Sequence, residues 1–417
     1  MAPFPEGFQG DMDEVFQQAY QNTTAVVEGN FITGLVLPPN STLPTTDQGP
    51  IAMNGTWYFW DPTTNQYLAQ VAPYKPAKNF VRNSCYQIAQ QGGAFTLGAG
   101  VTQTYDLVIS RAILANVLAI ASDVGPSAGS DTDLIPAAIK YTVGPTLVPT
   151  LGATDLYTHE HLIEGSDIIM LQGQQMALSF SVYPTVAGTY SVYLTNGNRD
   201  QSYVTTFAIS AAQVNTWVRV KIINIPAFPS GTGWHYGDGT TGLYIGFPMG
   251  VGAQFQSATL NAWRSGLFCG SAQNINMLTV VNNQLKVTGI KLEASPSSTY
   301  LQVPSFGLDF EEMQRYYTTS FDYQSTTSGW GIITAASAVN TVLFTQQFFR
   351  RMCQIPTVTP YGWVSNAAGQ VTNISTSTDA AQATLGATRK GIAATITPTA
   401  AKGDAFAAKF RADARIS

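Results

Sequence analysis

The sequence predicts a mainly β protein, with two β-sandwich domains of jelly-roll type after a short N-terminal helix and an aromatic hairpin. Three observations support this class. Short segments that alternate apolar and polar residues recur between residues 175 and 247, with no helical period between them. A second group of such segments lies between residues 315 and 412. Charged residues are only 11% of the 417 residues whereas hydrophobic residues are 45%, so Gly, Ser, Thr, Asn and Gln supply much of the polar surface, which suits strands and turns.

A short amphipathic helix is expected near the N-terminus. Asp11 and Glu14 have the spacing of a capping box at a helix start. Apolar side chains recur at helical spacing at Met12, Val15, Phe16, Ala19 and Tyr20. A proline-punctuated stretch at residues 37–46 is then expected to be extended.

Residues 55–67 predict a β-hairpin whose first strand carries four consecutive aromatic residues, with the turn at Asp61-Pro62. One hairpin and one helix are too small to fold alone, so the aromatic cluster requires a partner surface. We therefore interpret residues 1–75 as a docking segment. Its predicted contact residues are Phe16, Tyr20, Trp57, Tyr58, Phe59 and Trp60. The alternative is that the cluster packs onto the domain that follows.

Residues 76–305 are expected to form the first sandwich. Strands are predicted at residues 175–183, 188–194, 203–209, 217–223 and 242–247. The last of these follows a turn sequence, Gly237-Asp-Gly-Thr240. Short strands at this spacing are typical of two-sheet sandwiches.

A seam between two domains is predicted where this sandwich ends. The strand that closes at Glu293 is stopped by Pro296 and the serines around it. Asp309, Glu311 and Glu312 stand where a short helical turn would begin, because acidic side chains favour the N-terminal end of a helix. We interpret these carboxylates as part of a solvated interdomain turn with no chemical role.

Residues 306–417 are expected to form a C-terminal β domain. Its strands are predicted at residues 315–322, 329–333, 342–349, 357–364, 392–397 and 405–412. Trp330, Tyr361 and Trp363 lie in or beside these strands, among Ser, Thr, Gly and Asn residues. A flat ring with polar groups nearby suits the apolar face of a sugar, so these three are the predicted glycan-binding residues. The alternative is that they fill the core of this domain.

The seam resembles one found in bacteriophage fibre and tail proteins. In that family a strand ending in Leu-Glu closes a carbohydrate-binding-module-like sandwich, and an acidic pair followed by Gln-Arg-Tyr-Tyr leads into a terminal domain. The matching residues here are Leu292, Glu293, Glu311, Glu312, Gln314, Arg315, Tyr316 and Tyr317. Met313 stands where the family often has Cys. The opening at residues 79–92 and the closing stretch at residues 410–416 are also similar, so the resemblance covers roughly residues 76–417.

The resemblance implies a non-enzymatic virion fibre protein of a bacteriophage. It implies attachment by residues 1–75 to other virion proteins, a homotrimer, and a C-terminal receptor-binding domain that binds host surface carbohydrate. Such a protein is made in the host cytoplasm and is exposed on the particle. The main alternative is a purely structural collar, head-fibre or decoration protein. A polysaccharide depolymerase spike ranks third, because the sequence has no long parallel β-helix pattern.

Catalytic and metal-binding constellations are not predicted, and no cofactor is expected. For His159-Glu160-His161, with His235 as a third ligand, a surface loop is the preferred interpretation over a metal site. For Asp131 and Asp133, the alternative to an ordinary loop is a calcium site. Cysteines at positions 85, 269 and 353 have no paired spacing, so three buried free thiols are expected.

Charge and hydropathy exclude two classes of partner. A net charge of −5 without any Lys/Arg-rich run argues against nucleic acid. The longest apolar segment, residues 112–121, is shorter than the about 20 residues that a membrane span requires, so no membrane insertion is expected.

Overall fold

The computed structural model describes residues 77–127, 134–231 and 233–416, together with the backbone of six strands between residues 25 and 70. By its contacts the chain divides into two compact units, Met1–Pro76 and Ala77–Ser417. The mainly β prediction is confirmed, because antiparallel sheets dominate the second unit. Among the described residues, no helix combines the length and the apolar character needed to cross a bilayer.

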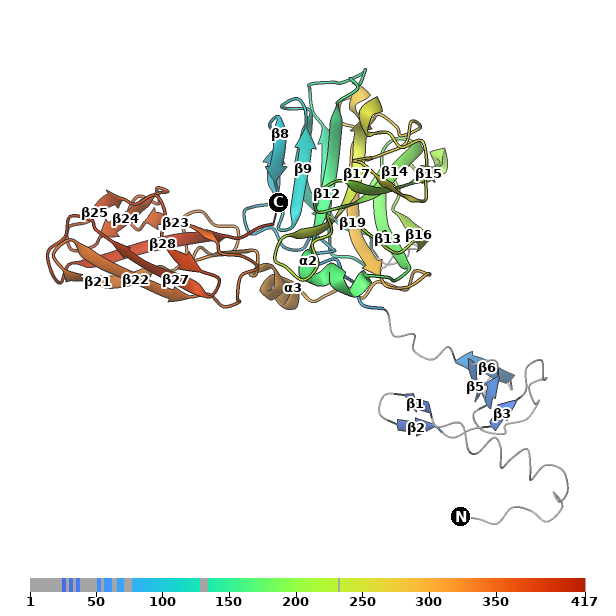
Figure 1. Cartoon of the computed structure of the whole chain (residues 1–417), viewed down its shortest axis with the longest axis horizontal. Coiled ribbons are helices and arrows are strands. Elements are labelled where there is room, and N and C mark those ends of the chain that lie inside the picture. The colour runs from blue at the N-terminus through green and yellow to red at the C-terminus, as the bar shows by residue number, and fades with distance from the viewer. Residues whose placement is uncertain are drawn as a thin grey trace, which may run out of the picture. The chain divides into compact units, whose positions relative to one another are not determined.

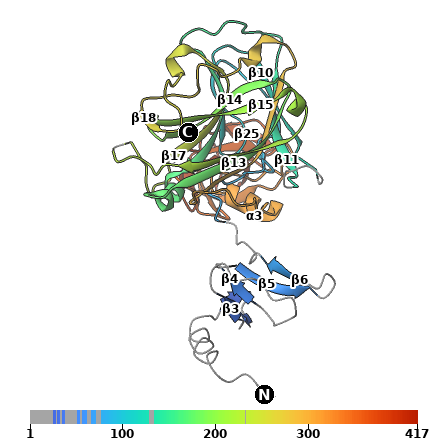
Figure 2. The same ribbon diagram turned by 90° about the vertical axis from the view of Figure 1, so that its right-hand side faces the viewer.

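The first unit contains two small sheets, and Figure 2 labels the strands of the larger one. The strands are β1 (Ala25–Val27), β2 (Asn30–Ile32), β3 (Leu35–Leu37), β4 (Ile51–Met53), β5 (Thr56–Asp61) and β6 (Gln66–Gln70). The predicted aromatic hairpin is confirmed as β5 and β6, and it belongs to a four-stranded sheet of order β3-β4-β5-β6. Phe16, Tyr20 and the predicted helix lie outside the described residues. The docking role of the residues from Trp57 to Trp60 therefore stays a prediction.

The sandwich of the second unit consists of two antiparallel sheets (Figure 1). The six-stranded sheet runs in the order β16 (Val218–Ile225), β13 (Met176–Pro184), β19 (Gln284–Glu293), β11 (Ala137–Val143), β10 (Leu118–Val124) and β7 (Ala94–Thr96). The seven-stranded sheet runs in the order β18 (Trp263–Ser265), β15 (Gln201–Ile209), β14 (Gly188–Asn196), β17 (Thr241–Val251), β12 (Leu156–Glu164), β9 (Val108–Ala112) and β8 (Gly100–Gln103).

One hydrophobic core joins the inner faces of these sheets. Phe180 on β13 and Phe247 on β17 meet edge to face with ring centroids 4.9 Å apart, and both are buried. Short helices occur between the strands of the sandwich: α2 (Gly165–Ile168), η1 (Ile169–Leu171), η2 (Ala211–Gln213), η3 (Ala253–Phe255) and η4 (Met277–Thr279).

The prediction that His159-Glu160-His161 lies in a surface loop is wrong. These residues are in the middle of β12, between β17 and β9, and all three are buried. His159 lies between two tyrosine hydroxyls, each 2.7 Å away: Tyr86 Oη from Nε2 and Tyr141 Oη from Nδ1. The buried Glu160 carboxylate forms ion pairs with two arginines. Polar residues are tolerated in this strand because partners from distant segments satisfy them.

His161 gives the fold a measurable dependence on pH. Its Nε2 donates to the Arg82 carbonyl oxygen at 2.8 Å, and burial lowers its pKa from 6.5 to about 4. The unfolded chain takes up this proton near pH 6.5 and the folded chain only near pH 4, so stability is lost as the pH falls between these values. His161→Gln keeps an N–H donor but cannot titrate. Chemical denaturation at pH 7 and pH 4 is expected to show about 3 kcal/mol less acid-induced loss for the variant. Equal losses for both proteins would contradict this assignment.

The terminal domain is a nine-stranded antiparallel system around β28. Its main path is β25 (Thr378–Ala381), β24 (Gln370–Asn373), β28 (Ala405–Asp413), β21 (Ile332–Ala338), β22 (Thr341–Gln347), β27 (Gly391–Ile396) and β26 (Ala387–Thr388). Strands β20 (Tyr317–Thr319) and β23 (Thr357–Gly362) also pair with β28. Alternate residues of β28 enter the core, among them Phe406, Ala408 and Phe410. The other face of β28 carries Lys409, Arg411 and Asp413.

Candidate functional site

The helix α3 (Phe306–Met313) connects the sandwich to the terminal domain and lies between them in Figure 1. Ser305 caps it, since its Oγ accepts a hydrogen bond from the Leu308 amide. Residues 309, 312, 313 and 316 follow one another at helical spacing, which points them to one side, toward the opening segment of the sandwich. The contacts described next make up the seam between the two domains.

The end of β19 is held by a buried carboxylate. Glu293 accepts hydrogen bonds from the Thr299 amide at 2.7 Å and from Thr299 Oγ1 at 2.5 Å. Its Oε2 also lies 3.1 Å from Nζ of Lys291, which is itself buried. These contacts fold the segment after Glu293 back onto the strand and explain why an acidic residue stands at the strand end.

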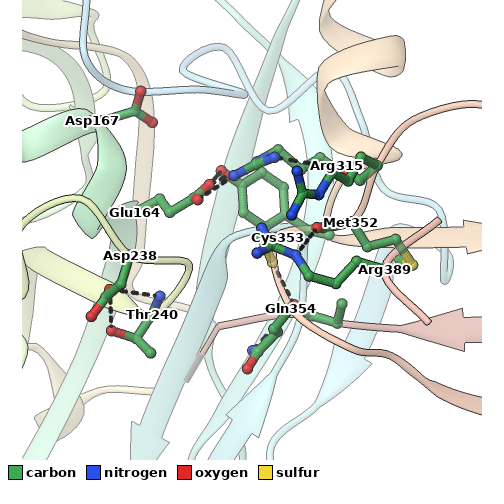
Figure 3. A network of polar contacts seen from close by, with 12 residues as sticks. Glu164, Asp167, Asp238, Thr240, Arg315, Met352, Cys353, Gln354 and Arg389 are labelled. Carbon is green, nitrogen blue, oxygen red and sulfur yellow. Dashed lines mark hydrogen bonds and ion pairs between the residues drawn. The ribbon is translucent and has the colours of Figure 1, made fainter. Parts of the chain in front are cut away.

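A second buried carboxylate joins the two domains directly (Figure 3). Arg315 Nε donates to Glu164 Oε2 at 2.9 Å and its Nη2 donates to Oε1, while Tyr316 Oη donates to Oε2 at 2.7 Å. Burial raises the pKa of Glu164, but the hydrogen bonds from Arg315 and Tyr316 outweigh burial and hold the pKa below its usual value. The carboxylate is therefore ionised and links β12 to the segment after α3.

The prediction of a solvated interdomain turn is wrong for one of its three carboxylates. Asp309 is buried, and its Oδ1 accepts a hydrogen bond from the backbone N–H of Asn83 at 3.1 Å. Burial raises the pKa of Asp309 to about 6. Glu312 forms an ion pair of 2.9 Å with Arg82 of the sandwich. Glu312 and Glu311, which pairs with Arg350, are exposed as predicted, with side chains 51% and 53% exposed. The difference arises because the helix packs one face against the sandwich.

Apolar contacts continue across the same seam. Leu162 and Tyr244 of the seven-stranded sheet belong to one hydrophobic cluster with Met313, Tyr316 and Met352. Close backbone approach adds to this packing: a Cβ at residue 239 would lie 2.1 Å from the carbonyl oxygen of Cys353, so glycine is required there. The two domains are thus joined by a packed interface.

A groove of about 400 Å³ opens at the edge of this interface, and we call it the seam groove. The sandwich contributes Gln91 and Gln103. The terminal domain contributes Tyr317, Thr357, Thr359, Tyr361, Arg411, Asp413 and Arg415. Paired residues of β23 and β28 form its floor. Thr359 pairs with Arg411, and Thr357 pairs with Asp413, on the polar face of β28.

One cation of the groove is fully engaged by protein partners. Arg415 donates to both oxygens of Asp413, with Nε to Oδ1 at 3.0 Å and Nη2 to Oδ2 at 2.6 Å. Its Nη1 donates to Gln91 Oε1 at 3.0 Å, and its guanidinium lies 5.3 Å from the Tyr317 ring centroid. Arg415 therefore fixes the sandwich wall of the groove against the terminal domain.

The structure brings together two of the three predicted glycan-binding residues. Tyr361 lines the seam groove. Trp363 lies next to it on the same face, since Lys409, the strand partner of Tyr361, places its Nζ 5.4 Å from the Trp363 ring centroid. The Trp363 ring also covers Gly331, where a Cβ would lie 2.5 Å from Cζ3.

Trp330 is separated from the other two. It is 40% exposed and meets Phe410 edge to face at 5.6 Å. Because Phe410 belongs to the core face of β28, Trp330 lies on the opposite side of the sheet from Tyr361 and Trp363.

Sequence reasoning missed Arg411, Asp413 and the two glutamines of the groove. The alternation of Lys409, Arg411 and Asp413 with the apolar residues between them was the available signal for a polar strand face. Gln91 and Gln103 carried no such signal, because they reach the groove only through the packing of the seam.

The described histidines and cysteines are not among the residues that line the seam groove. Within the described parts of the chain, no group of three or more His, Cys, Asp or Glu side chains is arranged to hold a metal ion. His235 bonds instead to Asn198 Oδ1 at 2.9 Å. Asp131 and Asp133 lie outside the described residues. The three cysteines are buried and none of them forms a disulfide with another described residue, which confirms that prediction.

No protein-family model and no curated protein matches the sequence. Among solved structures, TmCBM61 in complex with β-1,4-galactotriose matches at 10% identity over 52% of this chain and 100% of its own, with a TM-score of 0.25. A putative sugar-binding protein from Bacteroides thetaiotaomicron matches at 11% identity over 52% and 100%, with a TM-score of 0.26. The family 11 carbohydrate-binding module from Clostridium thermocellum matches at 10% identity over 49% and 98%, with a TM-score of 0.25.

Proposed function

We propose that this protein is a non-enzymatic glycan-binding protein and that the seam groove receives a saccharide. The observation that carries the proposal is the composition of this groove: a tyrosine ring beside threonine hydroxyls, glutamine amides and an Arg–Asp pair. A ring platform accepts the apolar face of a sugar, and the surrounding polar groups exchange hydrogen bonds with its hydroxyls. The volume of about 400 Å³ lies within the usual range for small-ligand sites.

The lining of the groove favours binding over hydrolysis. Among the described residues that line it, Asp413 is the one carboxylate, and Arg415 engages both of its oxygens. Glycoside hydrolysis generally uses two carboxyl groups, one on each side of the scissile bond. This lining supports a binding protein over a depolymerase.

The direct test is a glycan array probed with the purified full-length protein, followed by titration of the best soluble oligosaccharide. Saturable binding is expected. A protein that binds no glycan but still assembles into particles would instead support the structural alternative, a collar, head-fibre or decoration protein.

We further propose that the protein is a bacteriophage fibre or tail component attached by residues 1–75, as its resemblance to that family implies. The homotrimer implied by the same resemblance is tested by light scattering of the full-length protein, where a monomer mass would exclude it.

Removal of the first 76 residues tests this attachment. The chain from Ala77 has its own hydrophobic cores and forms a separate compact unit. The truncated protein is therefore expected to stay folded and to bind glycan, yet to be missing from purified particles. Insolubility of the truncated protein would favour the alternative, in which Trp57, Tyr58, Phe59 and Trp60 cover the following domain.

A further inference from the structure

We propose that the seam groove selects anionic saccharides, and that Arg411 binds their carboxylate or sulfate group. This inference rests on the proposed glycan-binding function and names the class of sugar. It follows from the charges of the groove, from the surroundings of Arg411, and from its place beside Tyr361.

The charges leave one cation uncompensated in the groove. Two arginines and one carboxylate line it. Asp413 is engaged on both oxygens by Arg415, so these two charges offset each other. Arg411 remains as a net positive charge, although the chain as a whole has a formal net charge of −5. An anion is therefore favoured at this point of an otherwise acidic protein.

Aromatic rings hold the Arg411 guanidinium. Its central carbon lies 5.0 Å from the ring centroid of Tyr361 and 5.2 Å from that of Phe321. Among the described residues, no side chain or carbonyl forms a hydrogen bond or an ion pair with this guanidinium. The neighbouring cation of the same strand face differs, since Lys409 Nζ donates to the Thr327 carbonyl and to Asn366 Oδ1. Ring contacts orient a guanidinium without using its N–H donors, so those of Arg411 stay open to a ligand.

The strand register places the N–H donors of Arg411 beside the Tyr361 ring. Tyr361 pairs with Lys409, and Thr359 pairs with Arg411 two residues further along β28. Two residues of a strand span about 7 Å, which is the scale of one sugar ring with its substituent. A sugar on Tyr361 thus has its charged substituent within reach of Arg411, whose planar fork matches a carboxylate or a sulfate.

The test compares three classes of probe on the full-length protein: oligogalacturonates, sulfated oligogalactosides and neutral oligogalactosides of the same length. We expect the wild type to prefer the anionic probes, with a preference that weakens as salt is added. Arg411→Gln is expected to lose roughly tenfold or more in affinity for the anionic probes and to keep its affinity for the neutral ones. Arg411→Lys, which keeps the charge but not the fork, is expected to lose less. A preference for the sulfated or for the carboxylated probe then identifies the anion.

Arg350→Gln is the matched control, because Arg350 forms an exposed ion pair with Glu311 outside the groove and its loss should leave binding unchanged. Equal wild-type affinity for neutral and anionic probes would overturn the inference while leaving the proposed function intact. An Arg411→Gln variant that loses both probe classes equally, with an unchanged melting temperature, would also overturn it. Failure of the wild type to bind any probe or any arrayed glycan would overturn both proposals.

Discussion

Replacing Arg315 by methionine is expected to lower the free energy of unfolding by about 3–5 kcal/mol, because Glu164 would lose its counter-charge at a buried site. The Glu164 side chain is 0% exposed and receives two of its hydrogen bonds from Arg315. The Tyr316 hydroxyl would remain as a donor but carries no compensating charge. Methionine keeps the apolar stem, so the change isolates the ion pair. Urea denaturation of the two proteins at pH 7 measures the difference.

Arg350→Met provides the matched control at an exposed ion pair. The side chains of Arg350 and Glu311 are 52% and 53% exposed, and such pairs contribute about 0–1 kcal/mol. If Arg315→Met and Arg350→Met were destabilised equally, the seam would not depend on the buried carboxylate. Arg315→Met is also expected to weaken glycan binding, since the sandwich wall of the groove is held through the seam.

Glu293→Leu is expected to have a comparable cost, about 3–5 kcal/mol, because it removes the carboxylate that pairs with Lys291 in the interior. The Lys291 side chain is 1% exposed, and that of Glu293 is 0% exposed. The same substitution removes the acceptor of the Thr299 amide and hydroxyl. Thermal and urea unfolding should both report the loss.

The double variant Lys291→Met/Glu293→Leu separates charge from packing. A buried pair replaced by apolar residues of similar size often costs little, so the double variant is expected to be clearly more stable than Glu293→Leu alone. A double variant as unstable as the single one would show that the loss comes from the Thr299 contacts of Glu293 rather than from its ion pair with Lys291.

Elements with clean alternation could be predicted from the sequence. A strand at residues 175–183 is observed as β13 (Met176–Pro184), and one at residues 405–412 is observed as β28 (Ala405–Asp413). In both, one face enters a core, so the period-2 pattern is strong. Strand β12 could not be predicted, because its polar residues are satisfied by partners that are distant in sequence. The strand expected at residues 315–322 is reduced to β20 (Tyr317–Thr319), since α3 and its C-terminal turn take the preceding residues.

The candidate site was predicted only in part for a similar reason. Residue type and flanking polarity are local properties, and they drew attention to Tyr361, which lines the seam groove, and to Trp363 beside it; the glycan-binding role of both stays a prediction. They could not show that Trp330 faces the other way, because that depends on strand register. The contact between Gln91 and Arg415 joins residues 324 positions apart, and no local pattern encodes it.

The most direct test of the seam groove as the glycan site is glycan binding and melting of Tyr361→Ala, with Trp330→Ala as the control on the opposite face of the sheet. Tyr361 meets Phe321 edge to face and also contacts the Arg411 guanidinium, so its removal is expected to cost about 1–2 kcal/mol of stability. The account predicts that Tyr361→Ala stays folded and loses saccharide binding, whereas Trp330→Ala binds like the wild type. Unchanged binding by a folded Tyr361→Ala protein, or loss of binding in Trp330→Ala alone, would contradict it.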